Sequence, residues 1–293
     1  MRFAHIHDIS LAELLKASFK QFRVHDMKAY AAAIAYHLLF SLFSFIVFLI
    51  ALLGFLELSD LFEWLRQQAQ NAFPEQTMEH IDQILDQLQK RRVGMLSFGA
   101  IVALWAASSG MRSMMNALNR VYDISEERPA WKRYGLSFLY TLAIGFLLIL
   151  AATLVLITPQ AIAAVADEFG VARTLASLWG WWLRWPIVIL LLTAIVAIVY
   201  RIGPDAEQRF RYVTPGAFLA VMAWTSISLV FEFYVRQVAP QNKFSGSVGT
   251  IVAMLFYFYI CSLVLLFGAE INAVLEHQAP TGKDAGEKTI KEA

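Results

Sequence analysis

The stretch GMLSFGAIVALWAASSGMRSMMNALN, which runs from Gly94 to Asn119, decides the fold. Residues 94–107 are almost wholly apolar, and the second half of the stretch places an arginine, Arg112, among small and polar residues. An arginine near the centre of a membrane helix costs roughly 2.5 to 3.5 kcal/mol on insertion scales, so it needs water or a polar partner. We therefore expect Arg112 to face the inside of a helix bundle.

One face of this predicted helix is polar. Side chains three or four positions apart lie on the same side of a helix. Four polar residues follow that spacing: Ser108, Arg112, Asn116 and Asn119. This face predicts an intramembrane polar site.

Composition supports a membrane protein. Of the 293 residues, 58% are hydrophobic and only 16% are charged, and several apolar runs reach the ~20 residues that cross a bilayer. A net charge of +1 argues against a dedicated nucleic-acid surface. The single cysteine, Cys261, excludes an internal disulfide.

The apolar runs predict an all-α fold, a polytopic membrane helix bundle with six transmembrane helices. The predicted spans are 30–56, 94–119, 135–159, 178–200, 213–238 and 245–275. Residues 1–29 should form a cytoplasmic amphipathic helix on the membrane surface, with Ser10 and Glu13 as a capping box; a soluble partner-binding helix is the alternative. Residues 58–92 predict an extracytoplasmic amphipathic hairpin, and 276–293 a disordered cytoplasmic tail.

The distribution of basic residues predicts the orientation. Six spans put both termini on one side of the membrane. That side would carry fifteen lysines and arginines and the other side eight, with Arg112 inside the membrane. The positive-inside rule therefore places both termini in the cytoplasm.

This topology brings three ionisable residues to one depth. Arg112, Glu270 and His37 each fall in the cytoplasmic half of their span. They suit a polar transport site, but an Arg112–Glu270 ion pair that only locks helices together, with His37 as a buried neutral histidine, explains them equally. Asn272 lies about 200° around the helix from Glu270, so the two should serve different neighbours.

A second polar face lies near the outer end of the fifth predicted span. Ser228, Glu232 and Arg236 share this face. Polar groups near both membrane surfaces would suit a path that is gated at each end.

Motifs for catalysis or metal binding are weak. His5, His7 and Asp8 resemble part of a zinc-hydrolase motif, but no further histidines and carboxylates follow at the spacing that closes such a site. The sequence contains no phosphate-binding loop and no nucleophile elbow. We therefore predict no enzyme activity, no metal site and no cofactor.

A series of short blocks resembles the YihY/BrkB family of bacterial inner-membrane proteins, formerly labelled ribonuclease BN. The blocks are Ala31–Tyr36, Leu104–Gly110, Ala117–Tyr122 with Arg128, Tyr200–Arg201 with Pro204, Thr214–Ala217 with Trp224, Gly246–Gly249 and Gly268–Ala273. The chain lacks the family's usual proline near Ser44 and tyrosine near Phe244.

The resemblance implies a six-helix protein of the inner membrane, linked in part to serum resistance and virulence or to envelope lipid traffic. Together with the polar residues it favours a transporter or lipid-translocating protein. The expected partners are membrane lipids, with an envelope lipid or a small molecule as substrate and no nucleic acid; a homo-oligomer stays open. The alternatives are a non-transporting scaffold and, least favoured, a membrane-bound ribonuclease.

Overall fold

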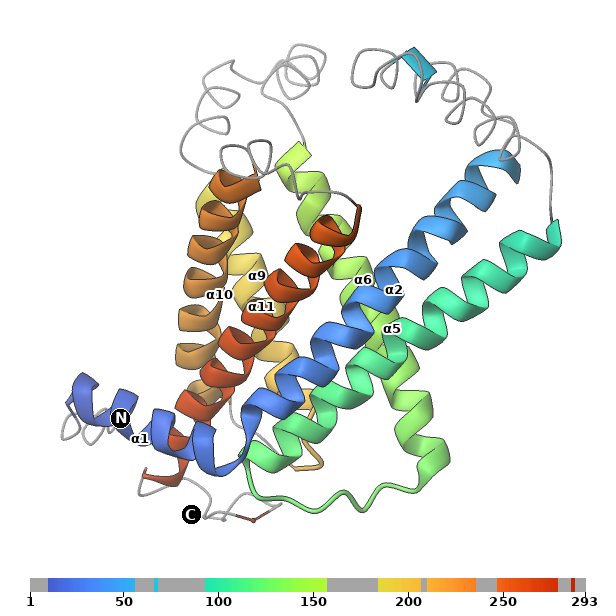
Figure 1. Cartoon of the computed structure of the whole chain (residues 1–293). Helices are drawn as coiled ribbons and strands as arrows, with labels where there is room; N and C mark the ends of the chain where they lie inside the picture. Colours follow the sequence, from blue (N-terminus) through green and yellow to red (C-terminus); the bar gives the residue numbers. More distant parts are fainter. Residues whose placement is uncertain are drawn as a thin grey trace, which may run out of the picture. The chain divides into compact units, whose positions relative to one another are not determined.

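The computed structural model describes residues 10–55, 66–67, 93–156, 184–206, 210–235, 247–278 and 286–287, and the regular secondary structure in these ranges is helical (Figure 1). The helices are α1 (Leu11–Val24), α2 (Met27–Phe55), α5 (Val93–Val121), α6 (Ala130–Leu156), α9 (Arg184–Ile202), α10 (Phe210–Phe233) and α11 (Ser247–His277). The predicted all-α class is confirmed for these residues. The predicted hairpin at 58–92 and the tail at 276–293 lie largely outside the described residues.

The chain divides into two compact units. The first contains Met1–Tyr36 and Gly110–Ala293, and the second contains His37–Ser109. The boundary therefore falls within α2 and within α5. Each unit is described separately below.

In the first unit, the helices pack in a continuous series. α6 packs against α9, α9 against α10, α10 against α11, and α11 against α1. Small and aliphatic side chains fill the core, with Tyr122 and Tyr200 as its largest members. Small residues allow helices to approach closely, as is common where lipid rather than water surrounds a bundle.

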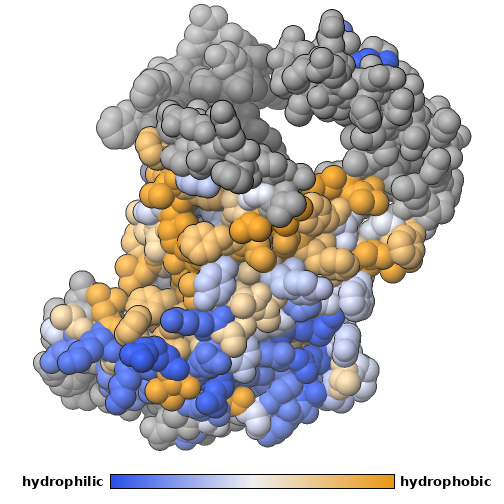
Figure 2. Space-filling view, in the orientation of Figure 1, coloured by the Kyte–Doolittle hydropathy of each residue, from blue (hydrophilic) through white to orange (hydrophobic). Residues whose placement is uncertain are grey.

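The outer surface of this unit is apolar along the helices. Trp131 is 77% exposed, Leu190 72% and Val230 69%, on α6, α9 and α10 respectively. Figure 2 shows hydrophobic side chains over α10 and α11, with hydrophilic ones gathered at the lower end of the view, where α1 lies. A soluble protein does not leave so much large apolar surface in water, whereas a bilayer covers it.

Among the described residues, five helices are long and apolar enough to cross a membrane. Their candidate spans are Met27–Phe48, Ala130–Thr153, Arg184–Ile202, Thr214–Phe233 and Ile251–His277. The predicted second span is not among them. Its helix, α5, has 29 residues and is long enough to cross a membrane, but the side chains of residues 93–96 at its start lie outside the described part of the chain.

The closest helix approach in the first unit joins α10 and α11. The space beside Gly216 is occupied by the Gly268 carbonyl oxygen and the Asn272 side chain, so neither glycine has room for a Cβ atom. Pro215 interrupts the regular bonding of α10, and the Gly216 amide donates to Oδ1 of buried Asn272 at 2.7 Å. Asn272 thus satisfies a backbone group that a proline-containing helix leaves free.

The predicted capping box at the start of α1 is confirmed. The Ser10 hydroxyl accepts from the Glu13 amide at 3.2 Å, and Glu13 Oε2 accepts from the Ser10 amide at 3.0 Å. α1 lies across the C-terminal part of α11 (Figure 1), where the ring of Phe22 packs edge-on against Phe267 at 5.8 Å between centroids.

The second unit contains the remaining parts of α2 and α5. A Cβ atom on Gly99 would lie 3.3 Å from the Cα atom of Phe48, which places the two backbones close together there. Ser108 hydrogen-bonds to the Trp105 carbonyl of its own helix at 3.0 Å, and His37 is half-buried in α2.

Candidate functional site

A buried histidine–carboxylate contact lies at the polar end of the first unit. His25 caps the C-terminus of α1, and its Nδ1 atom lies 2.7 Å from Oε1 of Glu270 on α11. Its Nε2 atom lies 3.4 Å from Oδ2 of Asp123. His25 and Glu270 are buried, whereas the Asp123 side chain is 41% exposed.

Local backbone geometry brings these three residues together. At the end of α5 the Ile124 amide donates to the Asn119 carbonyl and the Asp123 amide to the Arg120 carbonyl, which is the Schellman pattern. That pattern needs a left-handed residue, and Asp123 has φ 53°. Asp26, which follows His25 at the bend between α1 and α2, has φ 53° as well. Aspartate tolerates this conformation better than most side chains.

The charge state of His25 should make stability depend on pH. The hydrogen bond with Glu270 raises the pKa of His25 against the effect of burial, and the charges of Glu270 and Asp123 add to the rise. A raised folded-state pKa gives stability that is fully present below the unfolded-state value of about 6.5 and is lost as pH rises through the folded-state pKa. We expect the thermal midpoint of the detergent-purified protein to fall over that interval.

Substitution of His25 tests this expectation. A hydrogen bond to a charged group contributes ~1.5–3 kcal/mol, so His25→Asn should lower the midpoint at pH 6 and flatten its pH dependence above that pH. Equal slopes for wild type and His25→Asn would assign the pH dependence to other groups.

A second polar cluster fastens the loop after α5 to the loop after α9. Arg128 donates through Nε and Nη2 to the two oxygens of Glu126 at 2.6 and 2.7 Å, and Nη2 also reaches the Gly203 carbonyl at 3.2 Å. Asn119 donates to Glu126 at 2.9 Å and accepts from the Asp205 amide at 2.7 Å. We call Asn119, Glu126, Arg128 and Asp205 the loop clamp.

The loop clamp shifts the pKa of Glu126. Burial raises the pKa of Glu126, but the hydrogen bonds and charge of Arg128, with a further hydrogen bond from Asn119, lower it below its ordinary value overall. Arg128 is only 8% exposed, so water screens this interaction weakly.

The polar face predicted on α5 turns mainly toward α6 in this unit. Arg112 donates to the buried Ser137 hydroxyl at 3.1 Å, and its guanidinium lies 4.4 Å from the ring centroid of Tyr134. Asn116 accepts a hydrogen bond from Arg133. Arg112 thus has the polar contacts that its position requires.

The structure does not form the predicted Arg112–Glu270 pair. Glu270 instead contacts His25, and Arg112 contacts Ser137 of α6. His37 belongs to the second unit. Asn272 and Glu270 serve different neighbours, Gly216 and His25, as predicted.

The predicted outer polar face is described in part. The Ser228 hydroxyl lies 2.9 Å from the Tyr257 hydroxyl of α11, and the Tyr257 ring stacks on Phe231 at 4.5 Å. Glu232 is exposed near the end of α10, and Arg236 lies outside the described residues.

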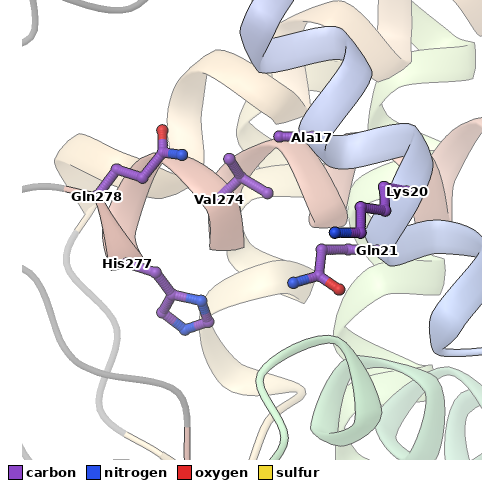
Figure 3. Close-up of a pocket in the computed structure, with 6 residues that line it drawn as sticks. All are labelled: Ala17, Lys20, Gln21, Val274, His277 and Gln278. Atoms are coloured by element: carbon purple, nitrogen blue, oxygen red, sulfur yellow. The ribbon is translucent and has the colours of Figure 1, made fainter.

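A pocket of about 220 Å³ opens between α1 and α11 (Figure 3). Gln21 lies four residues before His25, and Val274 lies four residues after Glu270. The residues that line the pocket are Ala17, Lys20, Gln21, Val274, His277 and Gln278. Among the described residues, no group of three or more His, Cys, Asp or Glu side chains is arranged to hold a metal ion.

Sequence reasoning did not select His25, Asp123, Glu126 or Asp205. His25 stands at a helix junction, where the periodicity of neither helix indicates its direction. The available signal was the acidic residue that follows each helix, Asp26 after α1 and Asp123 after α5, since both mark a left-handed helix end.

Comparisons with known proteins identify the family. The family described as "Virulence factor BrkB" matches residues 18–292 of the chain. The chain belongs to the BrkB family. This BrkB-family chain is also 34% identical over 265 residues to the ribonuclease-like protein YfkH of Bacillus subtilis (strain 168). The alignment covers 89% of this chain and 94% of YfkH.

Two further relatives are described as membrane proteins. The BrkB-family chain is 26% identical over 198 residues to UPF0761 membrane protein VV0203 of Vibrio vulnificus (strain YJ016), covering 64% of this chain and 58% of the relative. It is 23% identical over 181 residues to UPF0761 membrane protein xcc-b100_3490 of Xanthomonas campestris pv. campestris (strain B100), covering 61% and 41%. No solved structure matches the chain. The chain is thus a membrane protein of the BrkB family.

Proposed function

We propose that this BrkB-family protein is a transporter or lipid-translocating protein of the bacterial inner membrane. The observation that carries the proposal is Glu270. Its side chain is 1% exposed within a candidate membrane span, and its Oε2 atom is buried without a hydrogen-bond partner among the described residues. An incompletely satisfied carboxylate inside a membrane protein is costly, and function is the usual reason for keeping one.

The proposal includes six spans and cytoplasmic termini. With 29 residues α5 has a length of about 43 Å, enough to cross a ~30 Å hydrocarbon core, and its Arg112 and Asn116 side chains bond to α6. His25, Asp123, Asp205 and Gly286 come from segments that meet at one end of the first unit. Those segments belong to the side that is rich in lysine and arginine, which the positive-inside rule assigns to the cytoplasm.

The test is lipid movement by purified protein. Proteoliposomes carrying nitrobenzoxadiazole-labelled phosphatidylglycerol or phosphatidylethanolamine are quenched with dithionite, which reports transfer between leaflets. We expect faster transfer than in protein-free vesicles, and at least tenfold slower transfer for Arg112→Ala and Glu270→Ala at equal protein level. Ser226→Ala is the matched control and should behave as wild type, because within the described residues the hydroxyl of this exposed serine bonds to Met222 of its own helix.

Other outcomes favour the alternatives. If the protein moves no lipid and no small anionic solute faster than empty vesicles do, the scaffold is favoured. Cleavage of RNA by the purified protein with Mg²⁺ or Mn²⁺ would favour the ribonuclease. Because Arg112 contacts Ser137, we do not expect charge reversal at Arg112 and Glu270 to restore either variant.

A further inference from the structure

His25 has an acidic group opposite each of its ring nitrogens. Glu270 Oε1 lies 2.7 Å from Nδ1, and Asp123 Oδ2 lies 3.4 Å from Nε2. A neutral imidazole has one N–H group, so it would leave one nitrogen lone pair facing a carboxylate. An imidazolium donates to both. The geometry around His25 therefore favours a bound proton.

Glu270 offers a second place for a proton. Its Oε1 atom faces His25, but its Oε2 atom is buried and has no hydrogen-bond partner in the described part of the chain. An ionised carboxylate in such surroundings is stabilised by His25 only while the imidazole carries its charge. When His25 is neutral, a proton on Glu270 removes the uncompensated charge.

The other ionisable groups around the pair do not neutralise it. Asp123 and Arg120 face His25 from the end of α5, and they bind each other at 3.2 Å. Tyr122 lies within electrostatic reach of Glu270, Tyr200 and Glu276, and its hydroxyl is buried and has no hydrogen-bond partner in the described ranges. No basic side chain other than His25 makes a described contact with Glu270.

The three residues also form a short route to water. Asp123 is 41% exposed, His25 is 5% exposed and Glu270 is 1% exposed. When His25 is neutral with its proton on Nδ1, a proton that binds Asp123 can pass to Nε2 of His25 while the Nδ1 proton passes to Oε1 of Glu270, which leaves His25 neutral with its proton on Nε2. Only O–H and N–H bonds form and break, and one proton entering at Asp123 leaves one proton on Glu270.

We infer that His25 and Glu270 form a proton-binding site, loaded from water through Asp123, that couples proton movement to transport. The coupling rests on the function proposed above, whereas proton binding does not. The charge of His25 also has a mechanical consequence. The bend between α1 and α2 is held to α11 and to the end of α5 by His25, and a neutral His25 can donate to only one of them.

A pH jump tests proton binding without any knowledge of the substrate. The full-length protein is reconstituted in phosphatidylcholine vesicles on a solid-supported membrane, and the external pH is stepped from 8 to 6. We expect a transient charge displacement in the wild type, at least a tenfold smaller displacement in Glu270→Gln and His25→Gln, and a slower transient of equal total charge in Asp123→Asn. Glu13→Gln, an exposed carboxylate at the far end of α1, is the control and should match wild type.

The outcomes separate this inference from the proposed function. No transient in the wild type, or an unchanged transient in Glu270→Gln, overturns the proton site. If Glu270→Gln does not fold, Asp123→Asn decides: a slower transient supports the site, and an unchanged one overturns it. A wild-type transient without transfer of any lipid or small anionic solute keeps the proton site and removes the proposed function. A rate of lipid transfer that does not change when a pH gradient is imposed overturns the coupling.

Discussion

Replacing Gly268 with alanine is expected to destabilise the protein by ~3 kcal/mol, at the upper end of the cost of overpacking a core. A Cβ atom at Gly268 would lie 2.6 Å from the Gly216 carbonyl oxygen and 2.7 Å from the Ala220 Cβ atom. These neighbours are a backbone oxygen and a Cβ atom, so neither can move unless α10 and α11 separate. Separation would also break the bond between the Gly216 amide and Asn272. The thermal midpoint in detergent measures the loss.

Gly145→Ala is the matched control for this prediction. Gly145 also lies within a candidate membrane span, on α6, but nothing lies within 4 Å of a Cβ atom there. Alanine exceeds glycine in helix propensity by up to ~1 kcal/mol, so this variant should be as stable as wild type or slightly more stable. Equal midpoints for Gly268→Ala and Gly145→Ala would mean that α10 and α11 do not depend on close contact.

Sequence periodicity predicted the features that depend on one helix at a time. The Ser10–Glu13 capping box is local, and it forms as expected. Helix geometry was also enough to separate Glu270 from Asn272, because their angular separation does not depend on tertiary packing. The polar face of α5 could likewise be read from spacing, since Arg112 and Asn116 both find polar partners.

The choice of partner could not be predicted in the same way. Depth in the membrane suggested Arg112 for Glu270, but Glu270 contacts a residue at a bend between two helices. The position of His25 follows from a left-handed residue at Asp26, and that of its second partner from another at Asp123. Hydropathy carries no information on such backbone dihedrals, and two helix ends meet only when both turns are correct.

Arg128→Ala should have the second large effect, a loss of ~3 kcal/mol. Removing one partner of a buried ion pair costs ~3–5 kcal/mol, and the partial exposure of Glu126 and Asp205, 18% and 21%, places the value near the lower limit. The Glu126 pKa is lowered in the wild type, so this carboxyl contributes stability above its unfolded-state pKa that is lost as pH falls through the folded-state value. The loss in Arg128→Ala should therefore shrink at acidic pH.

Two further variants identify the cause of that loss. Arg120 pairs with Asp123 at 3.2 Å, but both side chains are largely exposed, so Arg120→Ala should cost no more than ~1 kcal/mol. Arg128→Lys keeps the charge but not the two-point contact with Glu126, so it should recover only part of the stability. If lysine restores the full thermal midpoint, charge alone holds the loop clamp together. If Arg128→Ala costs no more than Arg120→Ala, the clamp does not stabilise the junction between the loops after α5 and α9.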